Sequence, residues 1–148
     1  MLADRLRSGF PIGLLGGAVT AGALMGLGLR HQSASLAFEL GGRALLSTWR
    51  FGSPPVALSL AVGGVAHFFW MTLWGFCFSI AATRLRGTSL AAGALLFVLF
   101  LGALASTVVP GALGAVAFAA LTSAQTAFFL ALLAGAFIAG VVLTRDGR

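Results

Sequence analysis

Long stretches without any formal charge alternate with short stretches that contain arginine. A helix needs roughly 20 residues, at about 1.5 Å each, to cross a hydrocarbon core of roughly 30 Å. No charged residue lies between Gly87 and Thr144, and the Val-Pro-Gly sequence at 109–111 divides that stretch into two. The pattern predicts a single all-α domain over residues 1–148, an integral membrane four-helix bundle whose spanning helices are 9–29, 56–83, 88–108 and 113–144.

Residues 30–55 differ from the four runs because charged and hydrophobic residues are interleaved in them. Leu36 and Leu40 precede the pair Gly41-Gly42, and Leu45 and Trp49 recur at helical spacing after it. This pattern predicts one or two short helices at the membrane–water interface, with Trp49 near the headgroups. A partly ordered loop is the alternative.

Composition supports lipid as the solvent of this chain. Hydrophobic residues make up 59% and charged residues 8% of the 148 positions, whereas soluble domains carry about 25% charged residues. The formal net charge of +6 would suit a nucleic-acid partner. However, the arginines are scattered at the ends of the runs instead of being gathered on one face, which is typical of membrane topology and excludes that class.

The arginines also predict an orientation. If four helices alternate across the membrane, one side carries six arginines and the other side three, in the longer loop. Because positive residues accumulate on the cytoplasmic side, both termini are expected in the cytoplasm of a multi-pass protein of the bacterial inner membrane. The six are Arg5, Arg7, Arg84, Arg86, Arg145 and Arg148, and the three are Arg30, Arg43 and Arg50.

Glycines recur at intervals of four in the first run. Gly9, Gly13 and Gly17 form one set, and Gly22 and Gly26 form another. Small residues at this spacing let two helices approach closely in lipid. The partner is either a helix of the same chain or a helix of another subunit or copy, and the sequence leaves both open.

His67 is the one ionisable side chain deep inside an uncharged run, in the second helix. Such a group is expected to face the protein interior, neutral and hydrogen-bonded. A structural hydrogen bond to a neighbouring helix is one interpretation. A ligand to haem or (bacterio)chlorophyll, or a proton relay, is the other.

Counting residues from the helix ends places three polar residues at similar depth. Thr20 lies nine residues, His67 eleven and Gln125 twelve from the predicted outer ends of their helices. We therefore expect Thr20, His67 and Gln125 to form a polar layer between helices. In the structural interpretation this layer is a hydrogen-bonded cluster between helices. In the functional interpretation it is a contact for a cofactor or small molecule.

Two tryptophans, Trp70 and Trp74, follow His67 within two helical turns. Aromatic residues at this depth mostly pack against other helices or contact lipid. They also form suitable walls for the ring of a quinone, carotenoid or tetrapyrrole.

No catalytic motif accompanies these residues. The three acidic residues, Asp4, Glu39 and Asp146, all lie outside the predicted spans, and a coupled transporter normally needs ionisable groups inside them. We therefore expect a non-enzymatic accessory or structural subunit of a larger membrane complex, in contact with lipid. A haem-, pigment- or quinone-binding module that uses His67 is the first alternative, and a small homo-oligomeric transporter or channel is the second.

The layout resembles that of the YagU-like small four-helix inner-membrane proteins of bacteria. The similarity rests on Gly13-Leu14-Leu15-Gly16-Gly17, Met25, His67 followed by Gly75, the arginine turn at 84–86 and the Pro-Gly break at 110–111. The resemblance implies a further polar residue, often histidine, in the last helix. Gln125 occupies that place here, and the resemblance implies no activity.

Overall fold

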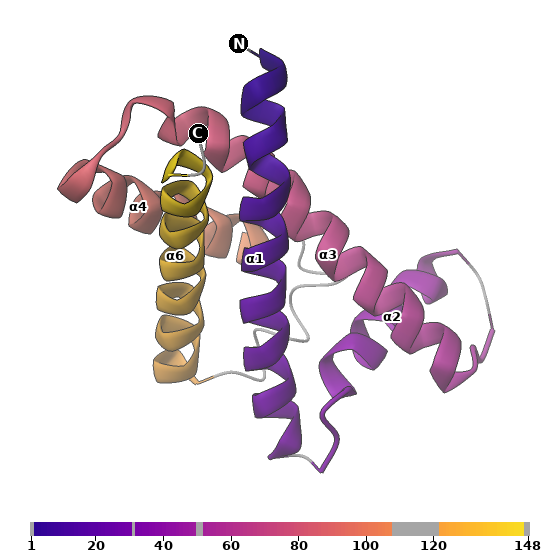
Figure 1. Cartoon of the computed structure of the whole chain (residues 1–148). Helices are drawn as coiled ribbons and strands as arrows, with labels where there is room; N and C mark the ends of the chain where they lie inside the picture. The colour runs from indigo at the N-terminus through magenta and orange to yellow at the C-terminus, as the bar shows by residue number, and fades with distance from the viewer. Residues whose placement is uncertain (1, 31, 50–51, 108–121, 147–148) are drawn as a thin grey trace.

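The computed structural model describes residues 2–30, 32–49, 52–107 and 122–146, and these segments contain helices and no strand (Figure 1). The α-helices, with one 3₁₀ turn (η1), are α1 (Leu2–Leu29), α2 (Leu36–Thr48), α3 (Val56–Ala81), η1 (Ala82–Arg84), α4 (Gly87–Thr107) and α6 (Ser123–Asp146). Helices α1, α3, α4 and α6 are each long and apolar enough to cross a membrane. The all-helical class and the four long helices are thus confirmed.

The boundaries differ from the prediction mainly in the last helix. Helix α6 begins at Ser123, whereas the uncharged run suggested a start at Leu113, which lies outside the described residues. Helix α1 begins at Leu2, so the basic N-terminal residues continue the helix beyond the uncharged run. The predicted span 56–83 comprises α3 and most of the 3₁₀ turn η1.

Helix α1 is the centre of the arrangement, because it packs against both α3 and α6, while α2 packs on α3 and α4 on α6 (Figure 1). Both ends of the chain and the α3–α4 connection lie at one end of the molecule. The α1–α2 connection and the start of α6 lie at the opposite end. Helices α1 and α6 run in opposite directions along the molecule, α3 runs obliquely to them, and α4 lies across them (Figure 1).

The first set of glycines in α1 forms the contact with α3. A methyl group at Gly13 would overlap the Cα atom of Thr72 and would lie 2.7 Å from the carbonyl oxygen of Met71. A methyl group at Gly9 would lie 2.7 Å from the Cα atom of Phe76, and Gly75 of α3 faces the backbone of Gly13 directly. Backbone meets backbone here, which confirms for this set the close packing expected within the chain.

The second set of glycines in α1 faces away from the other helices. Among the described residues, no atom lies within 4 Å of a methyl group built at Gly22 or Gly26. Met25 and Leu29, on the same side of the helix, are exposed as well. One half of α1 is thus used inside the molecule, and the other half presents small and apolar residues outward.

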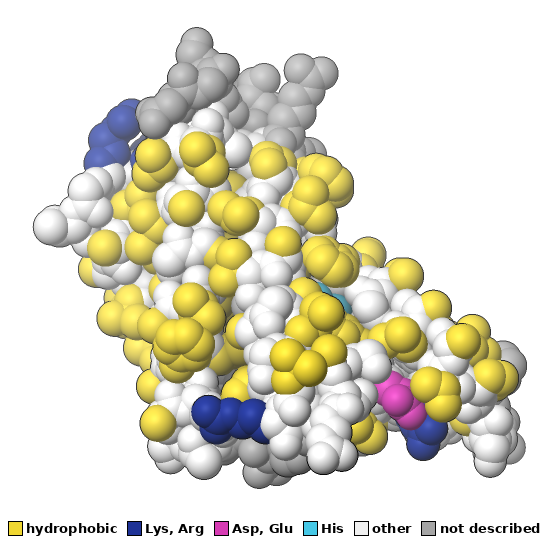
Figure 2. Space-filling view, turned by 60° about the horizontal axis from the view of Figure 1, so that its bottom comes forward, with side chains coloured by type: hydrophobic (Ala, Val, Ile, Leu, Met, Phe, Trp, Pro, Cys, Tyr) yellow, Lys and Arg dark blue, Asp and Glu magenta, His cyan; other side chains and the backbone are white. Residues whose placement is uncertain are grey.

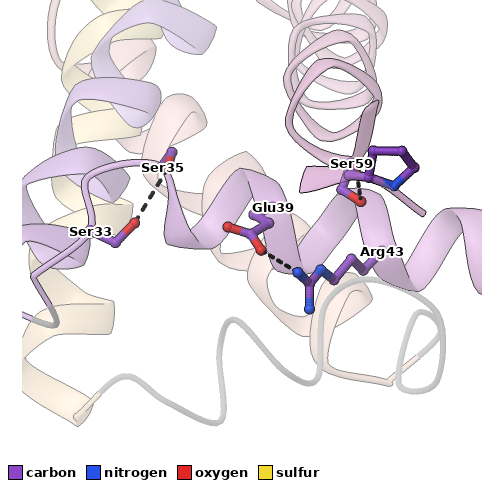
Figure 3. Close-up of polar contacts among 6 residues, drawn as sticks. Ser33, Ser35, Glu39, Arg43 and Ser59 are labelled. Carbon is purple, nitrogen blue, oxygen red and sulfur yellow. Dashed lines mark hydrogen bonds and ion pairs between the residues drawn. The ribbon is translucent and has the colours of Figure 1, made fainter. Parts of the chain in front are cut away.

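Helix α2 runs through Gly41-Gly42 without a break, so of the predicted one or two short helices the structure has one. Gly42 lets α2 pack closely on α3. A methyl group at Gly42 would overlap the carbonyl oxygen of Ser59, and one at Gly63 of α3 would overlap the carbonyl oxygen of Phe38. On the outer side of α2, Arg43 pairs with Glu39 at 2.7 Å (Figure 3).

The buried core lies where α1, α3, α4 and α6 meet. Phe78 of α3 stacks on Phe137 of α6 with ring centroids 5.1 Å apart, and Ile12 and Val98 are buried around this pair. Outside the core, hydrophobic side chains cover much of the visible surface (Figure 2). An exterior of this kind suits lipid and not water, and together with the four apolar helices it suggests a multi-pass membrane protein.

Candidate functional site

His67 joins α3 to α1 through a hydrogen-bond cluster. Its Nε2 atom lies 3.1 Å from the carbonyl oxygen of Gly17 and 3.1 Å from Oγ1 of Thr20. Thr20 is fully buried, and its hydroxyl donates to the carbonyl oxygen of Gly16 at 2.7 Å. The structure therefore brings together two of the three residues expected in the polar layer.

The partners of Nε2 determine where the imidazole carries its proton. A carbonyl oxygen only accepts hydrogen bonds, so the bond to Gly17 requires a hydrogen on Nε2. The Thr20 hydroxyl gives its one hydrogen to Gly16, which leaves an oxygen lone pair facing the ring. The network thus assigns an Nε2–H donor shared between Gly17 and Thr20, and leaves Nδ1 as the atom with a lone pair.

Helix α2 closes this site from a third side. The ring of Phe38 meets His67 edge-on, with centroids 5.5 Å apart, and Phe68 does the same from the neighbouring position in α3. His67 therefore stands where α1, α2 and α3 meet. Phe38 is not among the predicted site residues, and it lies beside α3 through the contact of Gly42 with Gly63, which only the structure shows.

Gln125 does not belong to this layer, so the predicted third member is wrong. Its Oε1 atom accepts a hydrogen bond from the backbone N–H of Thr122 at 2.9 Å, which caps the start of α6. Two contacts set the register of α6 along α1: Ile12 packs against Gly140, and Gly16 packs against Phe137. Continuing this antiparallel register by one more turn places Thr20 at the level of residue 133 of α6. Gln125 lies eight residues further along, roughly 12 Å away in a helix.

The tryptophans form a second cluster, between α3 and α4. Trp74 meets Trp70, Phe97 and Phe100 edge-on, with ring centroids 5.4, 6.0 and 6.4 Å apart. Trp70 remains 41% exposed, and the buried Nε1 of Trp74 has no hydrogen-bond partner among the described residues. The ring contacts of His67 are with Phe38 and Phe68, so the proposed aromatic wall and the histidine belong to separate clusters.

The geometry limits what His67 can do chemically. Its Nε2 is engaged with the α1 backbone, so a haem or chlorophyll ligand bond from Nε2 would require breaking the α1–α3 junction. Nδ1 is the remaining ligand atom. The part of the chain that is described contains no group of three or more His, Cys, Asp or Glu residues placed to hold a metal ion. The arrangement best suits a structural joint between three helices, and the cofactor hypotheses remain predictions that an absorption spectrum tests.

Comparisons with protein families, with curated proteins and with solved structures find no match to this chain. The class that the fold defines is an all-helical protein with four helices apolar enough to span a membrane. The resemblance to the YagU-like proteins remains a prediction.

Proposed function

We propose that this protein is a non-catalytic accessory or structural subunit of a larger complex in the bacterial inner membrane, with both termini in the cytoplasm. The observation that carries the proposal is the outward face of α1, where a methyl group built at Gly22 or Gly26 has no atom of the described segments within 4 Å.

The two faces of α1 are built alike, but among the described residues only one of them has a partner. In lipid, helices do not associate by excluding water, so they rely on small residues that permit close contact. Gly9 and Gly13 make such a contact with α3. Gly22 and Gly26 offer the same spacing to a helix that the described part of this chain does not provide, which favours another membrane subunit as the partner.

The polar side chains of the four long helices support a non-catalytic role. The hydroxyls of Ser59, Ser79 and Thr144 donate to backbone carbonyl oxygens within their own helices, as Thr20 does. His67 is committed to the backbone of α1. These polar groups are used in hydrogen bonds that stabilise the helices. Among the described residues of the apolar helices, no nucleophile is paired with a base.

The arrangement of helix ends supports the proposed orientation. The end that contains both chain termini and the α3–α4 connection also contains Arg84, Arg86 and Arg145 (Figure 1). The opposite end contains Arg30 and, on α2, Arg43, whose charge is paired with Glu39. The excess of arginine at the first end is typical of the cytoplasmic side.

The experiment is co-purification after gentle solubilisation and crosslinking, with the wild type compared with a Gly22→Leu/Gly26→Leu double variant. We expect stoichiometric membrane subunits with the wild type and their loss in the variant, because the new side chains occupy the contact face. The control is Gly64→Leu, at another open position, on α3. Recovery of the protein alone, or only with copies of itself, would contradict the proposal, and self-association would favour the homo-oligomeric alternative.

A further inference from the structure

The last turn of α6 is tied to the end of α3 by one arginine. Arg145 donates from Nη2 to the carbonyl oxygen of Ala82 at 2.7 Å and from Nη1 to the carbonyl oxygen of Leu85 at 2.8 Å. The carbonyl oxygen of Ala82 also accepts the N–H of Leu85 at 3.0 Å, so the guanidinium adds a second hydrogen bond at Ala82 and binds the carbonyl oxygen of Leu85 just beyond the end of η1. The contact fixes the position of Arg145 beside η1, and three of its five N–H donors are not used by these two bonds.

Two further arginines flank the same contact. Arg84 and Arg86 are the neighbours of Leu85 on either side, and both are exposed. Consecutive Cα atoms are about 3.8 Å apart, so Arg84 and Arg86 start within about 8 Å of each other, on either side of the residue whose carbonyl oxygen Arg145 binds. Among the side chains that the structure describes, Glu39 is the one carboxylate, and it pairs with Arg43 at the other end of the molecule. Glu39 therefore does not neutralise the positive charge of this end.

The surface next to these arginines is apolar. Ile80, in the last turn of α3, is 46% exposed, and Leu143, near the end of α6, is 66% exposed. A molecule that fits both the arginines and the apolar surface needs an anionic head that meets guanidinium groups and a hydrocarbon tail that lies along the helices. Free phosphate has only the first of these properties.

We propose that Arg84, Arg86 and Arg145 form a binding site for the phosphate headgroup of an anionic phospholipid. This inference rests on the membrane placement within the proposed function, because only then do the arginines lie at headgroup depth. Guanidinium forks match phosphate oxygens in bidentate geometry, and clustered arginines at the cytoplasmic surface attract anionic lipids. Arg145 is held rigidly by its two carbonyl bonds, and Arg84 and Arg86 supply the exposed charges.

The test compares lipid retention by native mass spectrometry of the full-length protein in micelles that contain equal amounts of phosphatidylglycerol and phosphatidylcholine. The variant is Arg84→Gln/Arg86→Gln, which leaves the structural bonds of Arg145 in place. Arg30→Gln is the matched control, since Arg30 is an exposed arginine at the opposite end. We expect wild type and control to retain phosphatidylglycerol selectively, and the double variant to lose about tenfold or more of that selectivity.

Two results would overturn the proposal. Equal retention of phosphatidylglycerol by the double variant, with an unchanged helical circular-dichroism spectrum, would show that these arginines do not form the site. Displacement of the lipid by millimolar inorganic phosphate would show a free-phosphate site instead. Either result with intact co-purification of partner subunits would refute this inference alone, whereas extraction of the protein from membranes by alkaline carbonate would refute the membrane placement itself.

Discussion

The replacement of Gly13 by alanine is the most informative single change, because Gly13 lies where the backbones of α1 and α3 touch. The new methyl group would overlap the Cα atom of Thr72 and would lie 2.7 Å from the carbonyl oxygen of Met71. Both obstacles belong to backbone, so no side chain can rotate aside. The two helices must separate locally, and the hydrogen bond from His67 to α1, one turn away, is expected to lengthen as well.

The magnitude follows from two opposing terms. Overfilling a packed contact costs about 1–3 kcal/mol, and a contact with backbone lies at the upper end of that range. Alanine in place of glycine in a helix gains about 1 kcal/mol. We therefore expect Gly13→Ala to lower the free energy of unfolding by about 2 kcal/mol. Gly22→Ala, in the same helix with nothing within 4 Å, receives only the gain of about 1 kcal/mol.

The assay is equilibrium unfolding in mixed micelles, with increasing sodium dodecyl sulfate and detection by tryptophan fluorescence. Two of the three tryptophans, Trp70 and Trp74, lie on α3 and report on its separation from α1 and α4. The two variants should differ by about 3 kcal/mol, or roughly two orders of magnitude in the folding equilibrium constant. If Gly13→Ala unfolds at the same midpoint as Gly22→Ala, the backbone contact between α1 and α3 does not exist as described.

Three further predictions use the same protein. A double-mutant cycle of Thr20→Val and His67→Ala should give a coupling of about 0.6 kcal/mol, and at most about 1.7, in that unfolding assay; a coupling of zero would mean that the two side chains are not bonded. Gly63→Ala should release α2 and speed hydrogen exchange of its amides, because the methyl group meets the α2 backbone, whereas Gly64→Ala should not; equal exchange in both would argue against the docking. Arg145→Gln should lower stability by about 2 kcal/mol through loss of charged hydrogen bonds, and unchanged stability would rule out the bonds to the end of α3.

Several features of the fold could be predicted because local sequence decides them. The length of an uncharged run determines whether a helix can span, and four runs became four helices. The spacing of Gly9, Gly13 and Gly17 in one helix identified a close-packing face. Depth counting also paired Thr20 with His67, since α1 and α3 end near the positions where their runs end.

The same depth count failed for Gln125 for a physical reason. It counted from a helix start at Leu113, and nothing in the composition of an apolar, uncharged stretch marks the residue at which a helix begins. The structure begins α6 at Ser123 and uses Gln125 in its cap. Only tertiary packing, through the contact of Gly16 with Phe137, sets the register of α6 along α1.

The docking of α2 on α3 could not be predicted from the sequence either. A pair of glycines is compatible with a break in a helix and equally with a close contact, and the pair Gly41-Gly42 alone does not distinguish the two. The choice depends on Gly63 in another helix, which receives the α2 backbone. The role of Phe38 beside His67 follows from that docking and not from its own neighbours in sequence.

The central claim is that these helices cross a lipid bilayer, with the α3–α4 connection on the side of the two termini and the α2–α3 connection on the other side. The direct measurement is labelling of single cysteines with a membrane-impermeant maleimide in intact cells and in inverted vesicles. Cysteine is placed at Gly52 or at Thr88, both exposed, in a Cys77→Ser background. The account predicts labelling of position 52 only from outside and of position 88 only from the cytoplasmic side. Labelling of both positions from the same side would contradict it.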